Sequence, residues 1–200
     1  MISNRVFAAI DFESAGAERG KTDVPVQIGM ATWSQDQGHG NFYVSYIHTD
    51  QSVSWAAQKV HGITKDDLSD APRFMSLWPE IKNRLNENIV VAHGHGTEKR
   101  YLRAFPAHGF GPWVDTLQLY RAAFPDLPSH ALGDLCEQFQ LTGKVTTLVP
   151  NKTWHDALYD SVASLVLLEY LIRELDLSQQ SEDILTNPDT RIWHRVKRSP

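Results

Sequence analysis

Short apolar runs in the first quarter of the chain predict three β-strands. The segment 6–10 (VFAAI) is continuously apolar, which is typical of a central strand covered on both faces. The segments 25–33 and 41–47 follow, and in the second of them Phe42, Val44 and Tyr46 fall on one face. Because the three runs follow one another closely, they predict an antiparallel meander.

The rest of the chain predicts helices with two further strands between them. The strands are expected over the short apolar segments 88–93 and 113–116. Helical spacing of apolar residues predicts helices over 53–62, 74–85, 97–105, 117–124 and 131–139. The segment 142–153 is polar and is expected to be a loop. This order predicts an α/β fold in which helices flank a central, mixed, five-stranded sheet.

The longest helix is expected to begin near Trp154 and to end near Leu175. From Ser178 onward the apolar pattern stops, so we expect a domain over 1–177 and an extension over 178–200 that lies outside the core. Basic residues gather near the end of this extension, at Arg191, Arg195, Lys197 and Arg198. A solvated tail is the favoured interpretation of them, ahead of a contact with nucleic acid or a partner.

Composition indicates one globular domain of 200 residues, with 42% hydrophobic and 22% charged residues. The net charge of -5 argues against a nucleic-acid binder unless the acidic residues are concentrated in a site. The single cysteine, Cys136, excludes an internal disulfide and suits the cytoplasm, and its apolar neighbours place it in the core. No apolar run reaches the ~20 residues that a membrane helix needs, so no membrane contact is expected.

Asp11 and Glu13 form the first candidate site. They lie two residues apart at the end of the first predicted strand, so both side chains point to the same face. Two neighbouring carboxylates repel each other unless a divalent cation bridges them, and hard oxygen ligands select Mg²⁺ or Mn²⁺. Taken alone, the pair is more commonly two solvated loop acids.

Two later segments carry further candidate residues for the same site. Glu98 falls in the first turn of a helix after a buried strand, where its carboxylate can point back toward the sheet edge. His155 lies at the start of the longest helix, and Asp160 follows five residues later. At about 100° per residue their side chains are about 140° apart, so His155 is expected at the edge of the helix, free to turn toward a site that Asp160 faces.

In this order the motifs resemble the DEDDh family of 3′–5′ exonucleases, which includes polymerase proofreading subunits and oligoribonuclease-like enzymes with a ribonuclease H-like fold. The resemblance extends from about residue 5 to 175. It rests on the segments AAIDFESAG, VPVQIGMA, VHGIT, IVVAHGHGTEKRYL and HDALYDS.

The second motif departs from the family pattern Ala-His-Asn-Ala-x-Phe-Asp, because the chain has AHGHGTE over 92–98. Glu98 replaces the usual Asp and Gly94 replaces the Asn, which changes the expected metal spacing and the shape of the nucleotide pocket. An alternative is that His93 and His95 bind a softer transition metal, although a role in the pocket is the favoured interpretation.

The resemblance implies a mechanism and a substrate. Two Mg²⁺ or Mn²⁺ ions would be held by four carboxylates, those of Asp11, Glu13, Glu98 and Asp160. His155 would act as the general base, and nucleoside monophosphates would leave the 3′ end of single-stranded DNA or RNA. The residues implied to contact the substrate are Phe12, Ser14, Ala15, His61 and His93, although a structural hydrogen bond is an equal expectation for His61.

Other interpretations stay open. Glu98 makes a catalytically weak nucleic-acid-binding module an alternative, although the retention of the other site residues argues against it. A proofreading subunit that works beside a polymerase is a second alternative, and a homodimer is a further possibility. Trp55, Trp78 and Trp113 are expected to pack in the interior; Trp55, close to the VHGIT segment, is the best candidate for stacking on a base.

Overall fold

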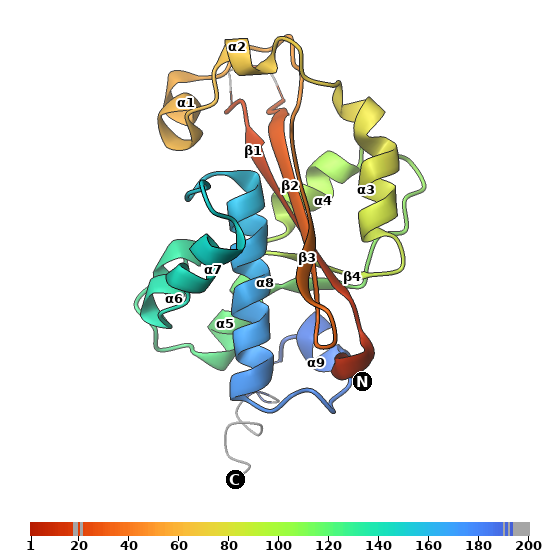
Figure 1. Ribbon diagram of the computed structural model, residues 1–200, viewed down its shortest axis with the longest axis vertical. Coiled ribbons are helices and arrows are strands. Elements are labelled where there is room, and N and C mark those ends of the chain that lie inside the picture. Colours follow the sequence, from red (N-terminus) through yellow and green to blue (C-terminus); the bar gives the residue numbers. More distant parts are fainter. Residues whose placement is uncertain (18–19, 21, 190, 192, 194–200) are drawn as a thin grey trace.

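A five-stranded sheet forms the centre of the computed structural model, which describes residues 1–17, 20, 22–189, 191 and 193 (Figure 1). The strands lie in the order β3-β2-β1-β4-β5. Their bounds are β1 Phe7–Ser14, β2 Pro25–Ser34, β3 Gly38–Tyr46, β4 Ile89–Ala92 and β5 Trp113–Asp115. The first three strands form the predicted antiparallel meander, and β4 and β5 run parallel to β1. The predicted mixed sheet is confirmed.

Helices cover both faces of this sheet (Figure 1). On one face lie α5 (Thr116–Ala123), α6 (Leu132–Gln138), α7 (Thr142–Leu148) and the long α8 (Ala157–Glu174). On the other face lie α3 (Trp78–Leu85) and α4 (Gly96–Leu102), and Pro79 lies in the first turn of α3. The short elements are η1 Ile2–Asn4, α1 Trp55–His61, α2 Lys65–Leu68, η2 Phe74–Leu77 and α9 Asp183–Thr186. In the part of the chain that the structure describes, no helix has both the length and the hydropathy to cross a membrane.

The two faces of β1 belong to two different layers of the core. Phe7 and Ala9 pack in the cluster under α8, whereas Ala8 and Ile10 pack in the cluster under α3 and α4. Burial on both faces explains the continuous apolar run from which the strand was predicted. The strand continues to Ser14, because its last residues pair with β2. Side chains alternate along a strand, so Asp11 and Glu13 lie on the α8 face with Phe7 and Ala9.

The predicted polar loop over 142–153 is wrong in its first half, where α7 forms. Val145 and Val149 lie four residues apart and are both buried against the neighbouring helices. Thr146 shares a hydrogen bond with Tyr159 of α8, with 3.0 Å between the two hydroxyl oxygens. Lys144 and the threonines of the segment made it look polar, although the two valines have helical spacing.

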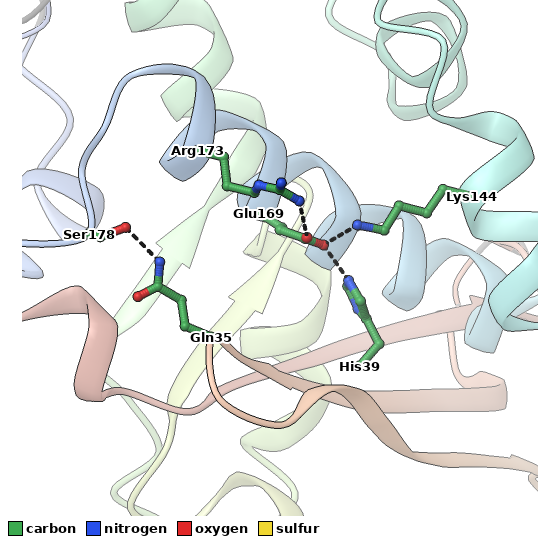
Figure 2. Close-up of polar contacts among 6 residues, drawn as sticks. All are labelled: Gln35, His39, Lys144, Glu169, Arg173 and Ser178. Carbon is green, nitrogen blue, oxygen red and sulfur yellow. Dashed lines mark hydrogen bonds and ion pairs between the residues drawn. The ribbon is translucent and has the colours of Figure 1, made fainter.

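Glu169 near the end of α8 is the centre of a charged cluster that ties three elements together (Figure 2). Its carboxylate lies 2.6 Å from Nε2 of His39 on β3, 2.5 Å from Nζ of Lys144 on α7 and 3.3 Å from Nη1 of Arg173. Burial raises the pKa of Glu169, but the hydrogen bonds from His39 and Lys144 outweigh burial and lower the pKa to about 2. A charged Glu169 therefore stabilises the packing of α7 and β3 on α8.

The described part of the segment after Ser178 packs against the domain, and the expectation that this segment lies outside the core is wrong for Leu185 and Trp193. Both side chains are fully buried in the cluster around α8. Two apolar residues eight positions apart are too few to give a periodic pattern, so the sequence did not reveal them. The segment is also joined to the N-terminus by a hydrogen bond from the amide of Ile2 to the carbonyl of Gln180. Of the predicted basic tail, Arg195, Lys197 and Arg198 lie outside the described residues.

Candidate active site

The first turn of α8 sits directly on β2, which decides where the candidate site forms. A β-carbon on Gly29 would lie 2.1 Å from the backbone of Ala157, so only glycine allows this approach. The side chain of Gln27 accepts a hydrogen bond from the amide of Ala157 (2.9 Å) and donates one to Oδ2 of Asp156 (3.2 Å). β2 therefore fixes the start of α8 beside β1, its neighbour in the sheet.

This placement brings Glu13 of β1 together with His155 and Asp160. One ligand atom from each side chain lies within 4.8 Å of the others, and no other group of this kind is found among the residues the structure describes. His155 is exposed and precedes α8, whose N-cap is Asp156. The backbone of His155 is left-handed, with a φ of 66°, a conformation that is uncommon for residues other than glycine. The predicted position of His155 at the edge of the helix agrees with the structure.

Glu98 is supplied by α4, the helix that lies on the opposite face of the sheet from α8. Gly94, with a φ of 83°, turns the chain after β4, and its amide donates to Oδ1 of Asp115 at 2.9 Å. The turn allows α4 to begin at Gly96, which places Glu98 in the first turn. The Glu98 side chain is only 5% exposed, and its Oε2 has no hydrogen-bond partner.

Burial and nearby negative charges raise the pKa values of all four carboxylates. Burial, followed by the charges of Asp160, Glu98 and Glu13, raises the pKa of Asp11 well above its usual value. Burial and the charge of Asp160 raise the pKa of Glu13 to about 8. The pKa values of Glu98 and Asp160 rise to about 7, again mainly through burial. Four acidic groups thus share a desolvated region, and among the described residues none of them forms an ion pair. The charge of Arg100 lowers the pKa of Glu98, but burial outweighs this effect.

This donor set fits a divalent cation. Oε2 of Glu98 and Oδ1 of Asp160 are buried oxygen atoms without a hydrogen-bond partner. Buried oxygens of this kind are costly unless something binds them, and carboxylate oxygens are the preferred ligands of hard divalent cations. Of the predicted ligands, Glu13 and Asp160 belong to the group whose ligand atoms lie close together. Asp11 is linked to both of them and to Glu98 by the charge repulsion that raises its pKa.

The other predicted residues surround the cluster in different ways. Phe12 points to the opposite face of the sheet, where its ring centroid lies 5.3 Å from that of Tyr101. Ala15 is buried, and its carbonyl accepts from the amide of Ser54. His61 donates from Nε2 to the carbonyl of Ser14 (3.0 Å) and accepts at Nδ1 from the amide of Ile63 (3.0 Å). Both nitrogens of His61 are therefore used in the structural role that the sequence left open.

His93 and His95 have separate partners. Nε2 of His93 donates to the carbonyl of His130 (2.9 Å), and its Nδ1 lies 2.9 Å from Oγ1 of Thr116. Nε2 of His95 lies 2.9 Å from Nζ of Lys99. Neither histidine belongs to the group of potential metal ligands found in the described residues. The structure gives no support to the alternative of a transition-metal site built from this pair.

Sequence reasoning missed the residues that position the site, above all Gln27, Gly29 and Asp156. The segment VPVQIGMA was noted for its resemblance, but its contacts with α8 could not be deduced from it. An acidic residue directly before an apolar helical pattern is a common N-cap, and this feature could have identified Asp156.

Comparison with known proteins places these residues in a family. The model of the exonuclease family RNase T matches residues 8–168 of the chain. The chain belongs to this family. The predicted membership of an exonuclease family is confirmed.

The relatives are segments of much longer proteins. The chain is 29% identical over 136 residues to the 3′-5′ exonuclease DinG of Staphylococcus haemolyticus, and the match covers 66% of the chain and 15% of DinG. It is 25% identical over 138 residues to the PolC-type DNA polymerase III of Bacillus subtilis, with 66% of the chain and 9% of the polymerase covered. The chain therefore corresponds to a small part of each relative.

Solved structures share the fold. Exonuclease X in complex with 5′ overhanging duplex DNA superposes with a TM-score of 0.68 at 23% identity, covering 84% of the chain and 92% of exonuclease X. The nuclease domain of 3′hExo, a DEDDh family member bound to rAMP, gives a TM-score of 0.67 at 14% identity, with the same coverage of 84% and 92%. The predicted ribonuclease H-like architecture is confirmed.

Proposed function

We propose that the protein is a metal-dependent 3′–5′ exonuclease that shortens single-stranded DNA or RNA from the 3′ end and releases nucleoside monophosphates. The observation that carries this proposal is the convergence of four carboxylates and one exposed imidazole at a single sheet edge. Such an edge, with its ligands already gathered, is suited to a substrate that arrives as a free end of a strand.

In this proposal Asp11, Glu13, Glu98 and Asp160 hold two divalent ions, Mg²⁺ or Mn²⁺. When bound, the ions supply Lewis-acid stabilisation of the charge that develops on the phosphodiester and make the attacking water more acidic. The chain's own contribution is to hold the four carboxylates in register, through β1, α4 and the first turn of α8. Their mutual repulsion is the electrostatic reason why the site favours cations.

His155 is the proposed general base, a group that accepts the proton of the attacking water. It is exposed, it lies within 4.8 Å of Glu13 and Asp160, and it is held outside the helix by its left-handed backbone. A histidine side chain is suited to this role because it titrates near neutral pH. Its exposure leaves room for a substrate on the solvent side.

Phe12, Ser14, Ala15, His61 and His93 remain the proposed subsite for the terminal nucleotide. For most of these residues the contacts favour an indirect role, in which the side chain shapes the subsite without touching the nucleotide. Phe12 and Ala15 are buried, and His61 and His93 join neighbouring loops to the sheet edge. In this role they would set the shape of the subsite while other atoms contact the base.

The proposal also covers the nucleic-acid substrate and the possible association with a polymerase. Solved relatives are bound to duplex DNA with a 5′ overhang, to a dA16 oligonucleotide and to rAMP, which supports a nucleic-acid 3′ end without selecting the sugar. The similarity to PolC-type polymerases supports the second candidate, a proofreading module that acts beside a polymerase. The predicted cytoplasmic location, the homodimer and the boundary at residue 177 stay predictions.

The test is a degradation assay on single-stranded DNA and RNA labelled at either end, with Mg²⁺, Mn²⁺ or EDTA. A 3′ label is expected to appear at once as a mononucleotide, whereas a 5′ label is expected to give a descending ladder. Asp11→Asn and Asp160→Asn are expected to abolish both, and Asp183→Asn, a change of an exposed acid on α9, serves as the matched control. Degradation that persists in EDTA or in both site variants would overturn the proposal.

A further inference from the structure

Helix α1 exposes a tryptophan close to the active site. The side chain of Trp55 is 75% exposed, the largest fraction among the large apolar residues of the described chain. The expectation that it packs in the interior is therefore wrong, and no residue of α1 is buried. An exposed indole offers a large apolar face and one hydrogen-bond donor, which suits it to contact a binding partner.

The backbone of α1 is fixed to the end of β1. The amide of Ser54 donates to the carbonyl of Ala15 (2.8 Å), two residues beyond Glu13, and His61 donates to the carbonyl of Ser14 (3.0 Å). Figure 1 shows α1 beside the end of β1. The exposed tryptophan is thus attached to the same strand end that carries the carboxylates.

The arrangement of side chains around α1 gives Trp55 a defined direction. Ala57 packs toward Gly16, and His61 reaches Ser14, so these two residues mark the face of the helix turned to β1. At about 100° per residue, Trp55 and Lys59 share a face on the other side of the helix. Nζ of Lys59 lies 5.3 Å from the centroid of the indole ring. The pair therefore offers an aromatic surface and a positive charge on the outer face of α1, the helix that is joined to the end of β1.

We propose that Trp55 and Lys59 bind the single strand upstream of the nucleotide that is removed, with the indole stacked on a base and the ammonium group beside a phosphate. The inference rests on the proposed exonuclease function and adds a contact for the strand outside the catalytic cluster. Aromatic side chains combined with nearby cations are the usual means of holding single strands without sequence preference.

Charge and area favour a nucleic-acid strand over a second protein. The catalytic edge is acidic, so a strand that enters it needs a cation nearby to hold its phosphates, and Lys59 provides one next to the indole. A single exposed indole offers at most about 250 Å² of contact area. A stable dimer buries about 800 Å² on each partner, which is far more than this surface supplies.

Binding is measured by the fluorescence anisotropy of a 5′-labelled single-stranded 12-mer, with every variant made in the full chain carrying Asp160→Asn. Trp55→Ala is expected to weaken binding by about 5- to 140-fold, the range that corresponds to the loss of one stacked base. Trp55→Phe keeps an aromatic face and is expected to retain most of the affinity. Phe42→Ala removes another exposed aromatic side chain, on the edge strand β3, and is expected to change nothing.

Two further measurements separate the roles of the pair. Lys59→Gln is expected to lower the slope of log affinity against log salt concentration by about 0.7, the value for one phosphate contact in a single strand. In otherwise unchanged protein, Trp55→Ala is expected to slow the degradation of the 12-mer at low substrate concentration but not the hydrolysis of a dinucleotide, which is too short to reach α1.

The outcomes distinguish this inference from the proposed function. If the Asp160→Asn parent binds the 12-mer and Trp55→Ala binds it equally well, the inference is overturned while the exonuclease proposal stands. If the parent binds no oligonucleotide and unchanged protein degrades none, both are overturned. If sedimentation shows a dimer that Trp55→Ala dissociates while oligonucleotide affinity is unaffected, the surface is a protein interface and the inference is overturned.

Discussion

The backbone of Gly29 lies directly against Ala157, so that a β-carbon on Gly29 would come within 2.1 Å of the carbonyl carbon of Ala157. Because neither backbone can yield easily, this contact sets the distance between β2 and the first turn of α8. It also sets the position of Asp160, one turn further along the helix.

Gly29→Ala is expected to displace the start of α8. Overpacking of this kind destabilises a protein by about 1–3 kcal/mol, and the shift of Asp160 should lower the rate of hydrolysis by more than tenfold. The measurements are thermal unfolding and the 12-mer degradation assay. Gly143→Ala is the matched control, since a β-carbon at this position of α7 meets nothing within 4 Å. Full activity in Gly29→Ala would show that the contact does not position the site.

His155→Asn tests the proposed general base. Asparagine tolerates the left-handed backbone conformation that His155 adopts, so the loop should keep its structure. The rate of hydrolysis is expected to fall by about 10²–10⁴-fold while Mn²⁺ affinity, measured by calorimetry, changes little. A variant that binds Mn²⁺ normally and hydrolyses at the original rate would remove His155 from the mechanism.

Glu98→Asp tests whether the longer side chain fits this site. Glu98 lies in the first turn of α4, which follows a turn built on Gly94, and its buried Oε2 has no hydrogen-bond partner. Shortening the side chain by one methylene should withdraw that oxygen, so we expect slower hydrolysis and a higher Mg²⁺ concentration for half-maximal rate. Faster hydrolysis with Mg²⁺ would instead mark Glu98 as a defect, as in the alternative of a weakly active binding module.

The cluster predicts an unusual dependence of stability on pH. In the folded, metal-free protein the pKa of Glu13 is about 8 and those of Glu98 and Asp160 are about 7, above the ordinary values of 4.5 and 3.8 that apply after unfolding. Between the two sets of values the folded state binds more protons than the unfolded state, so stability falls as pH rises from about 5 to about 8.

Thermal unfolding in EDTA should show this decline, and saturating Mg²⁺ should raise the melting temperature more at pH 8 than at pH 5.5. Asp160→Asn removes one of the repelling charges and is expected to flatten the decline in EDTA. A melting temperature that rises steadily across this range in EDTA would contradict the assigned cluster.

Glu169 should make stability depend on pH in the opposite direction, and over a lower pH range, than the site carboxylates do. Its folded pKa of about 2 lies below the ordinary 4.5, so its contribution to stability is present above pH 4.5 and is lost as the pH falls toward 2. Glu169→Gln is therefore expected to lower the melting temperature clearly at pH 7 and much less at pH 3. Glu174→Gln, an exposed position on the same helix, should have little effect at either pH. Equal losses at both pH values would indicate lost packing instead of lost charge.

Local patterns were sufficient to predict most of the fold. The apolar run at the start of β1 and the long stripe of α8 reflect burial, which the sequence records directly. The motif residues Asp11, Glu13, Glu98, His155 and Asp160 were identified through spacing and resemblance. The structure brings Glu13, His155 and Asp160 together, and the charges of Glu98, Glu13 and Asp160 act on Asp11.

The features that the sequence did not predict depend on contacts between segments that are far apart in the chain. Gln27 stabilises the start of α8 across 130 positions of sequence, and nothing in its own neighbourhood indicates that role. α7 was missed because its threonines and its lysine conceal the helical spacing of Val145 and Val149. The burial of Leu185 and Trp193 depends on a surface that exists only after the sheet and α8 have formed. Such contacts have no periodic signature.

The course of α8 has one more consequence. Its first turn carries Asp160, and Glu169 lies nine residues further along, about 13 Å away along the helix axis. One continuous helix therefore connects the edge of the sheet that carries the candidate site to the charged cluster shown in Figure 2. The same helix is thus held at both ends, by the backbone contact between Gly29 and Ala157 at its start and by the ion pairs of Glu169 near its end.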